Sequence, residues 1–422
     1  MKNKKFHYAW IILIAMSLIR GVSGPGINAS SGVFMTPVSE TLGVGIGQLS
    51  LYLSISSIAT LIWLPIAGNL INKKKVKTVV VLGVLLQTIA FIVLGFMSNI
   101  WAWYILAVPL AMGAALLVNL LGPVLVNRWF NKNIGVVMGL MMMITSLLGA
   151  VFQPVLTNLI ANNGWRFTYI AFGIFGLVFM LLVGLIFLKN APNDMGLKPF
   201  GWDEQNKVES TNQKAEGIQA NKALKSPAFF TLLLFMIVLT GFAAFQQHIA
   251  TFGLGMGLDM VTIGKALSIS MIGSAIGSVL IGLLSDRLGI VLTSVGVVGV
   301  GVFAIALFYI SNGNTMMFII ATFLHGLAIS SIGVVAPLLT IKFFGSLDYE
   351  KLFSTVMIGS PLASIVLMPL YGYIYDTFGN YNYVFIFLLV ALIVASAGLI
   401  FGYNNSKKLL QSNKVNNIKK SY

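Results

Sequence analysis

The stretch "GPVLVNRWF" (122–130) recurs 214 residues later as "APLLTIKFF" (336–344), with Pro123 aligned on Pro337. Both copies end in a basic residue followed by aromatic residues, and both follow a long apolar run. A single match of nine residues has little weight. Its register can be checked elsewhere in the chain, because a true duplication repeats at every equivalent position.

Two further alignments in the same register support a duplication. The stretch "GNLINKKK" (68–75) falls on "GLLSDRLG" (282–289), and Tyr169 falls on Tyr383. Three matches at one shift, placed at equivalent loops, indicate that the chain contains two copies of one structural unit.

The composition predicts that this unit lies in a membrane. Of 422 residues, 58% are hydrophobic and 9% are charged, against about 25% charged in soluble domains. Apolar runs of 18 residues or more recur along the chain, and each is long enough to cross about 30 Å of hydrocarbon. Twelve such spans are predicted, at about 8–35, 47–70, 78–97, 101–126, 135–160, 167–188, 228–252, 265–284, 290–310, 315–341, 351–373 and 381–403. The fold class expected is therefore an all-α integral membrane protein with twelve transmembrane helices.

Charge placement predicts the orientation of these spans. With a cytoplasmic N-terminus, 23 of the 26 Lys and Arg residues fall on the cytoplasmic side, and only Arg166 and Lys265 fall outside. This asymmetry follows the positive-inside rule. The net charge of +15 is thereby explained by topology and contact with anionic membrane lipids, and no nucleic-acid partner is expected. The predicted location is the cytoplasmic membrane, with both termini cytoplasmic.

One long polar stretch divides the chain into halves. We expect an N-terminal six-helix half over 1–188, a cytoplasmic linker over 189–226, a C-terminal six-helix half over 227–403 and a cytoplasmic tail over 404–422. The halves have the same orientation, because each contains an even number of spans.

Two six-helix halves in parallel orientation are the architecture of the major facilitator superfamily, whose substrate site lies near the midplane between the halves. The stretch "GLLSDRLG" resembles the loop signature of that superfamily, with Asp four residues after Gly and Arg next. In such a loop the Asp can accept from a helix N-terminus while the Arg reaches carbonyls or carboxylates. The loop-motif residues are Gly282, Asp286, Arg287 and Gly289 in this copy, and Gly68, Asn72 and Lys73 in the degenerate first copy.

Within the superfamily, three stretches resemble the bacterial oxalate/formate antiporters and their monocarboxylate-transporter relatives. They are "NRWFNKNIGVVMGLMMMITSLLGAVFQPVLTNLIANNGWRFTYIAFG", "PNDMGLKP" and "GYIYDTFGNYNYVF". The resemblance implies transport of small carboxylates. Oxalate antiporters carry cationic residues in spans eight and eleven, whereas both spans here are free of charge. A single cation suits a monoanion or a weakly charged solute better than the oxalate dianion.

That single cation is Arg20, in the stretch "SLIRGVSGPG". It lies about 18 Å along the first helix from Tyr8, close to mid-bilayer, where a charge is costly and usually faces a cavity or a partner. At 100° per residue, Ser17, Gly24, Asn28 and Ser31 share its face, and Gly24-Pro25-Gly26 is expected to loosen the helix. Arg20 either binds a substrate anion or bonds carbonyls of a neighbouring helix.

For most of the remaining candidate residues a purely structural role is an alternative to a role in transport. His248 near the outer end of span seven is a gate residue or a satisfied interface residue, and His325 in span ten is a proton relay or a helix–helix hydrogen bonder. Asn119, Gln87, Gln153 and Ser360 line the cavity or join helices, whereas Asn28 and Ser31 are expected in the substrate site on the face of Arg20.

These residues favour a secondary transporter for a small, monocarboxylate-like organic anion, coupled to a proton or a counter-anion and acting as a monomer. The alternatives are an efflux transporter for drugs or other amphipathic solutes, and a transport-derived sensor. No nucleophile–base set, metal-ligand spacing or cofactor fingerprint stands out, so we expect neither an enzyme nor a bound metal or cofactor.

Overall fold

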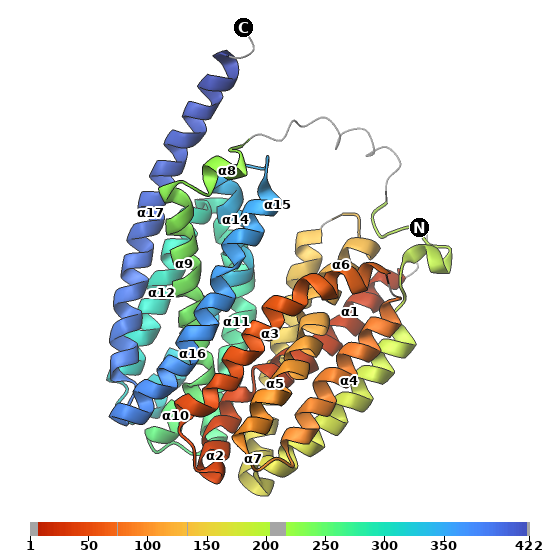
Figure 1. Ribbon diagram of the computed structural model, residues 1–422, viewed down its shortest axis with the longest axis vertical. Helices are drawn as coiled ribbons and strands as arrows, with labels where there is room; N and C mark the ends of the chain where they lie inside the picture. The colour runs from red at the N-terminus through yellow and green to blue at the C-terminus, as the bar shows by residue number, and fades with distance from the viewer. Residues whose placement is uncertain (1–6, 74, 133, 203–216, 420–422) are drawn as a thin grey trace, which may run out of the picture.

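The computed structural model describes residues 7–73, 75–132, 134–202 and 217–419. These residues are almost entirely helical, and the β-structure among them is limited to two isolated bridges. Figure 1 shows the helices running roughly side by side along one long axis.

The described residues of the first half form seven α-helices, with two π-helical segments inserted among them. They are α1 (Tyr8–Gly21), η1 (Val22–Asn28), α2 (Ser31–Leu42), α3 (Ile46–Lys73), α4 (Val76–Leu94), α5 (Ile100–Ala114), η2 (Ala115–Leu120), α6 (Leu121–Trp129) and α7 (Ile134–Phe187). The short η3 (Pro192–Met195) follows.

The second half repeats this plan with more interruptions. Its elements are α8 (Ala220–Ala223), α9 (Pro227–Ala244), η5 (Phe245–Gln247), α10 (Ile249–Gly255), α11 (Met260–Leu288), α12 (Ile290–Ile310), α13 (Thr315–Ile329), α14 (Ile332–Phe344), α15 (Tyr349–Met357), α16 (Gly359–Phe378) and α17 (Asn382–Lys419). The last helix continues well beyond the predicted end of span twelve and projects from the bundle (Figure 1).

Twelve crossings result, as the apolar runs predict. Within the described ranges, ten helical stretches are long and apolar enough to cross a membrane. One of them, α7, has 54 residues and turns back at Gly164, whose φ of 80° and ψ of 164° lie outside the helical region. It therefore makes two crossings. The turn between them is possible at Gly164 because glycine tolerates this positive φ. The shorter helices α13 and α14 together make the twelfth.

Spans four and ten break at equivalent places. In span four the π-helix η2 precedes Pro123, and in span ten α13 ends at Ile329 and α14 begins at Ile332, before Pro337, although the intervening Ser330 and Ser331 keep αR backbone angles. Proline lacks an N–H and clashes with the carbonyl four residues back, which for Pro123 is residue 119 in η2, so the proline accounts for the irregular backbone in span four.

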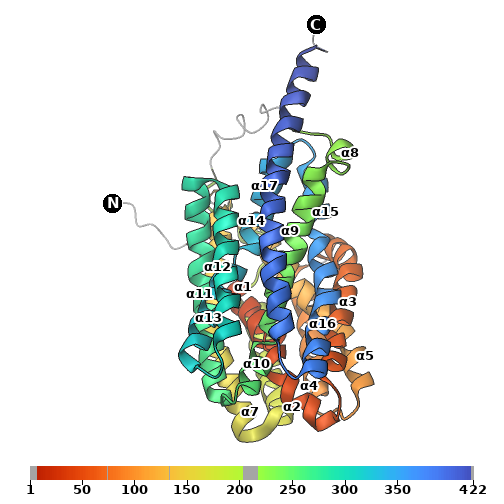
Figure 2. The ribbon, with the colours of Figure 1, turned by 90° about the vertical axis from the view of Figure 1, so that its left-hand side faces the viewer.

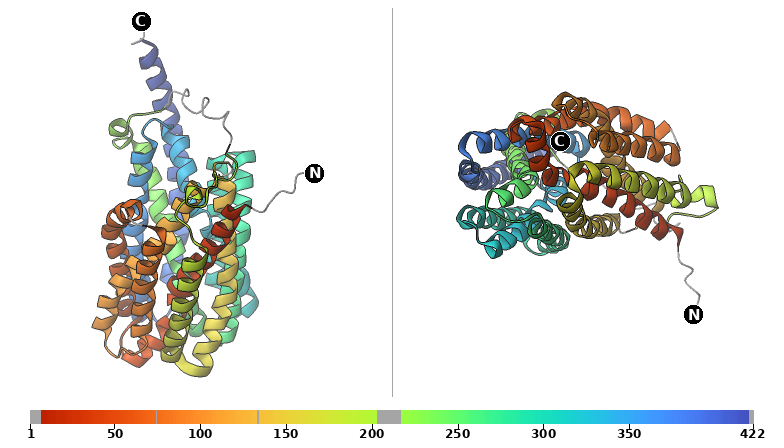
Figure 3. Two further views of the ribbon diagram at one scale, coloured as in Figure 1. Left: turned by 90° about the vertical axis from the view of Figure 1, so that its right-hand side faces the viewer. Right: turned by 90° about the horizontal axis from the view of Figure 1, so that it is seen from below.

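The two halves form two groups of helices side by side (Figure 3). We call the end of the bundle where α1 begins and α17 projects the terminal end, and the end where α7 turns at Gly164 the far end (Figures 1 and 2). The buried apolar core runs through both groups. Its packing between halves involves mainly α7 against α11 and α3 against α16.

Hydrogen bonds between the halves gather toward the far end. The amide N–H of Gly32 donates to Gln247 Oε1 over 3.0 Å, and Thr36 Oγ1 donates to Thr251 Oγ1 over 3.1 Å. Deeper in the bundle, Ser268 Oγ donates to the Ala150 carbonyl over 2.6 Å. In the described part of the chain no such bond joins the halves nearer the terminal end, so the far end is closed in this conformation.

Candidate functional site

Arg20 lies in the last turn of α1 and is half-buried. Its Nη1 donates a hydrogen bond to the backbone carbonyl of Val118 in η2, across to span four. Its Nε is buried without a hydrogen-bond partner among the described residues. The guanidinium therefore has one neutral acceptor and donor capacity left for another ligand, since arginine carries five N–H donors.

The helix beyond Arg20 is loosened, as its glycines and proline predict. Residues Val22–Asn28, which contain Gly24-Pro25-Gly26, form the π-helix η1, and the Ala29 N–H bonds the Gly24 carbonyl five residues back at 2.9 Å. A π-helix is rare and commonly marks a functional site. The two π-helices of this half, η1 and η2, contact one another.

Part of the predicted polar stripe is open. Gly24 and Asn28 are half-buried, and Asn119, which follows Val118 in η2, is exposed. A Cβ added to Gly24 would meet only the Val118 methyl groups, at 3.8 and 3.9 Å. The space beside Gly24 is therefore lined by the residue whose carbonyl holds Arg20.

Two serines of the predicted stripe point elsewhere. Ser17 is fully buried and donates to the Leu13 carbonyl at 2.7 Å, while Ser31 is 8% exposed and donates to the Asn28 carbonyl. Ser31 follows the π-helix, where each residue turns the chain by less than 100°. The regular helical wheel consequently misplaces it relative to Arg20.

A hydrogen-bond network connects the accessible residue Asn28 to buried residues of spans one and three. Ser23 Oγ donates to Gln87 Oε1 over 2.6 Å, and Gln87 Nε2 donates to the Ser23 carbonyl and, over 3.4 Å, to Asn28 Oδ1. Gln87 and Ser23 are completely buried. These residues join spans one and three and orient the Asn28 amide, whose N–H donors have no partner in the described structure.

Gln153 holds the other side of η1. It is completely buried on α7, and its Nε2 donates to the Pro25 carbonyl over 3.3 Å. Its Oε1 has no partner among the described residues. Because its side chain is buried, Gln153 supports the π-helix and does not line the open space beside Gly24.

His248 is placed as an interface residue. It is fully buried between η5 and α10, with Nδ1 3.0 Å from Tyr381 Oη and Nε2 2.9 Å from the Met368 carbonyl. A carbonyl only accepts, so Nε2 carries the proton and Nδ1 accepts from the tyrosine. Both ring nitrogens are then satisfied within the second half.

His325 is also buried within the second half. Its Nε2 donates to the Phe242 carbonyl over 3.0 Å, and its Nδ1 has no partner in the described structure. The rings of Phe242 and Phe245 lie 4.5 and 6.3 Å from the imidazole. This apolar setting favours the neutral ring, because a buried charge is costly without a partner. Ser360 lies apart from it, half-buried in the first turn of α16.

The loop-motif residues lie at the terminal end. Asp286 and Arg287 end α11 and are exposed, and neither side chain has a partner among the described residues. Gly289 joins α11 to α12 with φ of 83°. In the first copy, a Cβ on Gly68 would meet nothing within 4 Å. The side chains of Asn72 and Lys73 lie outside what the structure describes.

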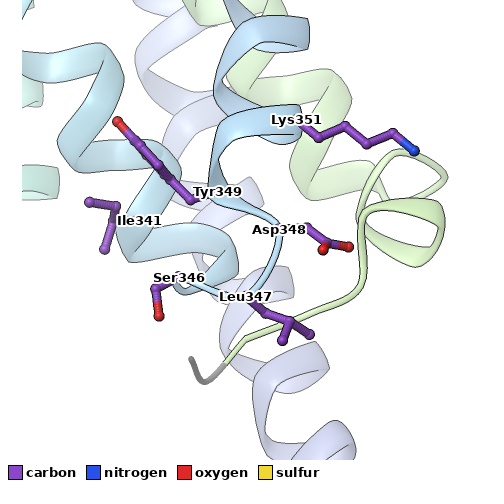
Figure 4. A pocket seen from close by; sticks show the side chains of 6 residues that line it. All are labelled: Ile341, Ser346, Leu347, Asp348, Tyr349 and Lys351. Atoms are coloured by element: carbon purple, nitrogen blue, oxygen red, sulfur yellow. The ribbon is translucent and has the colours of Figure 1, made fainter. Parts of the chain in front are cut away.

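A surface hollow of about 430 Å³ also lies at the terminal end, beside the turn between α14 and α15. Figure 4 shows Asp348 directed toward the α8 segment, and Tyr349 and Ile341 directed to the opposite side. Asp348 Oδ2 already accepts the N–H of Ala220 at 2.6 Å. Because these side chains diverge and the carboxylate is engaged, this hollow is a poor ligand site.

The structure thus places Arg20 and Gly24 against Val118 and leaves Asn28 half-buried and Asn119 exposed on the same two π-helices, while both buried histidines lie within the second half. Arginine and amide N–H groups facing an open space suit an anion. No group of three His, Asp or Glu residues suited to a metal ion occurs in the described part of the chain. The sequence reading missed the Val118 carbonyl, although the Gly-Pro pair at 122–123 marks its helix as irregular.

Comparison with known proteins identifies the family. The model of the Major Facilitator Superfamily matches residues 9–313 and 262–419. An uncharacterized MFS-type transporter, YhjX of Escherichia coli (strain K12), is 25% identical over 344 residues, which are 80% of each chain.

Solved structures with the same fold are more distant in sequence. A bacterial homolog of the human lysosomal transporter Spinster, in an inward-facing and unoccupied conformation, matches with a TM-score of 0.68 at 14% identity, over 96% of this chain and 98% of that one. The nucleoside transporter NupG matches with a TM-score of 0.71 at 12% identity, over 94% and 99%. At these identities the likeness shows the fold alone.

Proposed function

We propose that this chain, which belongs to the major facilitator superfamily, carries a small monocarboxylate-like organic anion across the cytoplasmic membrane by alternating access. The family makes it a multi-pass transport protein and not an enzyme. The substrate class is our inference from the site, and the protein acts as a monomer.

One observation supports an anionic substrate above all others: Arg20 is a charged group at mid-span with no carboxylate partner among the residues that the structure describes. Its only acceptor among the described residues is the neutral Val118 carbonyl. Charged residues at this depth ordinarily pair with one another or face a water-filled cavity. A carboxylate arriving from outside would supply the missing countercharge and accept from Arg20 in a charge-assisted bond.

The closed far end supports the transport cycle. We infer that the terminal end is cytoplasmic, because 23 of 26 basic residues would then lie on that side. The conformation is then closed to the outside, and opening requires the far-end contacts to break. We propose that the moving units are the halves 1–188 and 227–403, joined by the linker 189–226, with 404–422 as a cytoplasmic tail.

A second candidate is export or uptake of neutral amphipathic solutes. The observation in its favour is the Arg20–Val118 bond itself, because a guanidinium that already has a carbonyl partner can serve structure alone. Exchange of organic cations is disfavoured, since no carboxylate lies deep within a span.

A thermal-shift screen of the purified protein separates these functions. Formate, acetate, lactate and pyruvate are tested beside amino acids, nucleosides and cationic dyes. Stabilisation by at least one monocarboxylate, with matching uptake into proteoliposomes, supports the anion transporter. Stabilisation by neutral or cationic compounds alone overturns it. Binding without flux would indicate a sensor.

A further inference from the structure

The carbonyl that holds Arg20 belongs to an irregular helix. Val118 lies within η2, where the Leu121 N–H bonds the Leu116 carbonyl five residues back. In this register the carbonyl of Val118 requires the N–H of residue 123. That residue is Pro123, which has no N–H. Pro123 therefore cannot donate to the Val118 carbonyl, which accepts from the Arg20 guanidinium.

An orphan carbonyl in a low-dielectric setting needs a donor, because an unpaired backbone polar group in the membrane costs several kcal/mol. Arg20 supplies that donor, and the bond in turn fixes where the guanidinium lies. The guanidinium is brought to Val118, whose methyl groups border the open space beside Gly24. The proline therefore decides where the positive charge is presented.

The second half provides an internal comparison. Pro337 is the equivalent of Pro123 and also follows a break in its span. The position equivalent to Arg20, 214 residues on, is Leu234. The proline is thus present in both halves, whereas among the described residues the π-helix before it and the cation occur only in the first half.

We propose that Pro123 is a positioning residue for the anion site: by withholding an N–H it leaves the Val118 carbonyl free to orient Arg20 toward the substrate. This proposal rests on the proposed function for its ligand. The orientation of Arg20 itself can be measured without any substrate, so the two claims can fail separately.

The test compares Pro123→Ala with the matched control Pro337→Ala. Alanine restores an N–H and is a better helix former than proline, so both variants are expected to fold. The Val118 carbonyl in Pro123→Ala can then take a bond within its own helix. Phenylglyoxal modifies arginine side chains, and it reacts faster with a guanidinium that is not held by a hydrogen bond. The rate at which it modifies Arg20 is measured by peptide mass spectrometry. Exposed Arg287 is the internal reference.

We expect phenylglyoxal to modify Arg20 several-fold faster in Pro123→Ala than in the unaltered protein, with no change in Pro337→Ala. The affinity for whichever of formate, acetate, lactate and pyruvate binds most tightly should fall about tenfold in Pro123→Ala. This corresponds to the loss of one hydrogen bond to a charged group. Added to Arg20→Gln, Pro123→Ala should change binding no further, because both act through one guanidinium.

An unchanged Arg20 modification rate in Pro123→Ala overturns the positioning role, and so does an equal increase in Pro337→Ala. If no monocarboxylate stabilises the unaltered protein, the proposed function fails. The modification rates then still decide whether Pro123 orients Arg20.

Discussion

Gly47 of α3 and Gly372 of α16 meet backbone to backbone, so that a Cβ added to Gly372 would lie 2.6 Å from the Cα of Gly47. One turn further on, the Asp376 carboxylate accepts the N–H groups of Ile46 at 2.9 Å and Gly47 at 2.7 Å. These bonds tie the first turn of α3 in one half to the last turn of α16 in the other, at the far end. They form only when the two helices approach this closely.

Substitution of Gly372 by alanine should therefore open the far end. A Cβ cannot lie under 3.0 Å from backbone atoms, so α16 must move away from α3. In a background with Ser54→Cys, whose native hydroxyl donates to the Ile365 carbonyl between the same helices, an impermeant maleimide applied from outside should react faster. Gly299→Ala is the control, because its Cβ meets nothing within 4 Å. Equal labelling in both variants would contradict this account of closure.

The topology is tested by labelling at the two ends of the bundle. The chain has no natural cysteine, so a single introduced one reports alone. Asn163 at the α7 turn and Asn404 on α17 are both exposed. Impermeant maleimide should label Asn163→Cys in intact cells, and Asn404→Cys only after permeabilisation. The reverse pattern would invert the orientation.

The space beside Gly24 should limit substrate size. An alanine there makes only ordinary contact with the Val118 methyl groups, so the variant should fold. Its methyl group nevertheless occupies the space next to Arg20. We expect Gly24→Ala to weaken binding of lactate and pyruvate more than that of formate. Gly398→Ala, with one contact at 4.0 Å, serves as control. A uniform loss for all three acids would place the substrate elsewhere.

His325 should not carry the coupled proton. Its Nδ1 faces buried aromatic surroundings without an acceptor among the described residues, and a proton there would create an unpaired buried charge. We expect His325→Gln to weaken transport but to keep its response to a pH gradient across proteoliposomes. A variant that exchanges substrate normally yet no longer accumulates it would identify His325 as the proton carrier.

The sequence predicts the fold well because membrane spans are set by length and apolarity. All twelve crossings follow from the apolar runs, and the loosened helix follows from Gly24-Pro25-Gly26. Superfamily membership is confirmed, whereas the narrower likeness to the oxalate/formate antiporters stays a prediction.

The site is harder to predict, because its decisive contacts are made by backbone groups. Arg20 is found from its charge, but its partner is a carbonyl, which any residue can offer. A regular helical wheel also assigns Ser31 to the face of Arg20, and the intervening π-helix turns it away. Burial of His248 and His325 depends on packing between helices far apart in sequence, which residue patterns do not specify.

The role of Arg20 is tested most directly by equilibrium binding of the best of formate, acetate, lactate and pyruvate to purified Arg20 variants. Hydrogen bonds to charged groups contribute about 1.5–3 kcal/mol, or about 10- to 100-fold in affinity. Arg20→Gln should lose at least this much while retaining its melting temperature without ligand. Arg20→Lys should keep part of the affinity, because a point charge remains without the planar fork. Unchanged affinity in a folded Arg20→Gln would contradict the anion site.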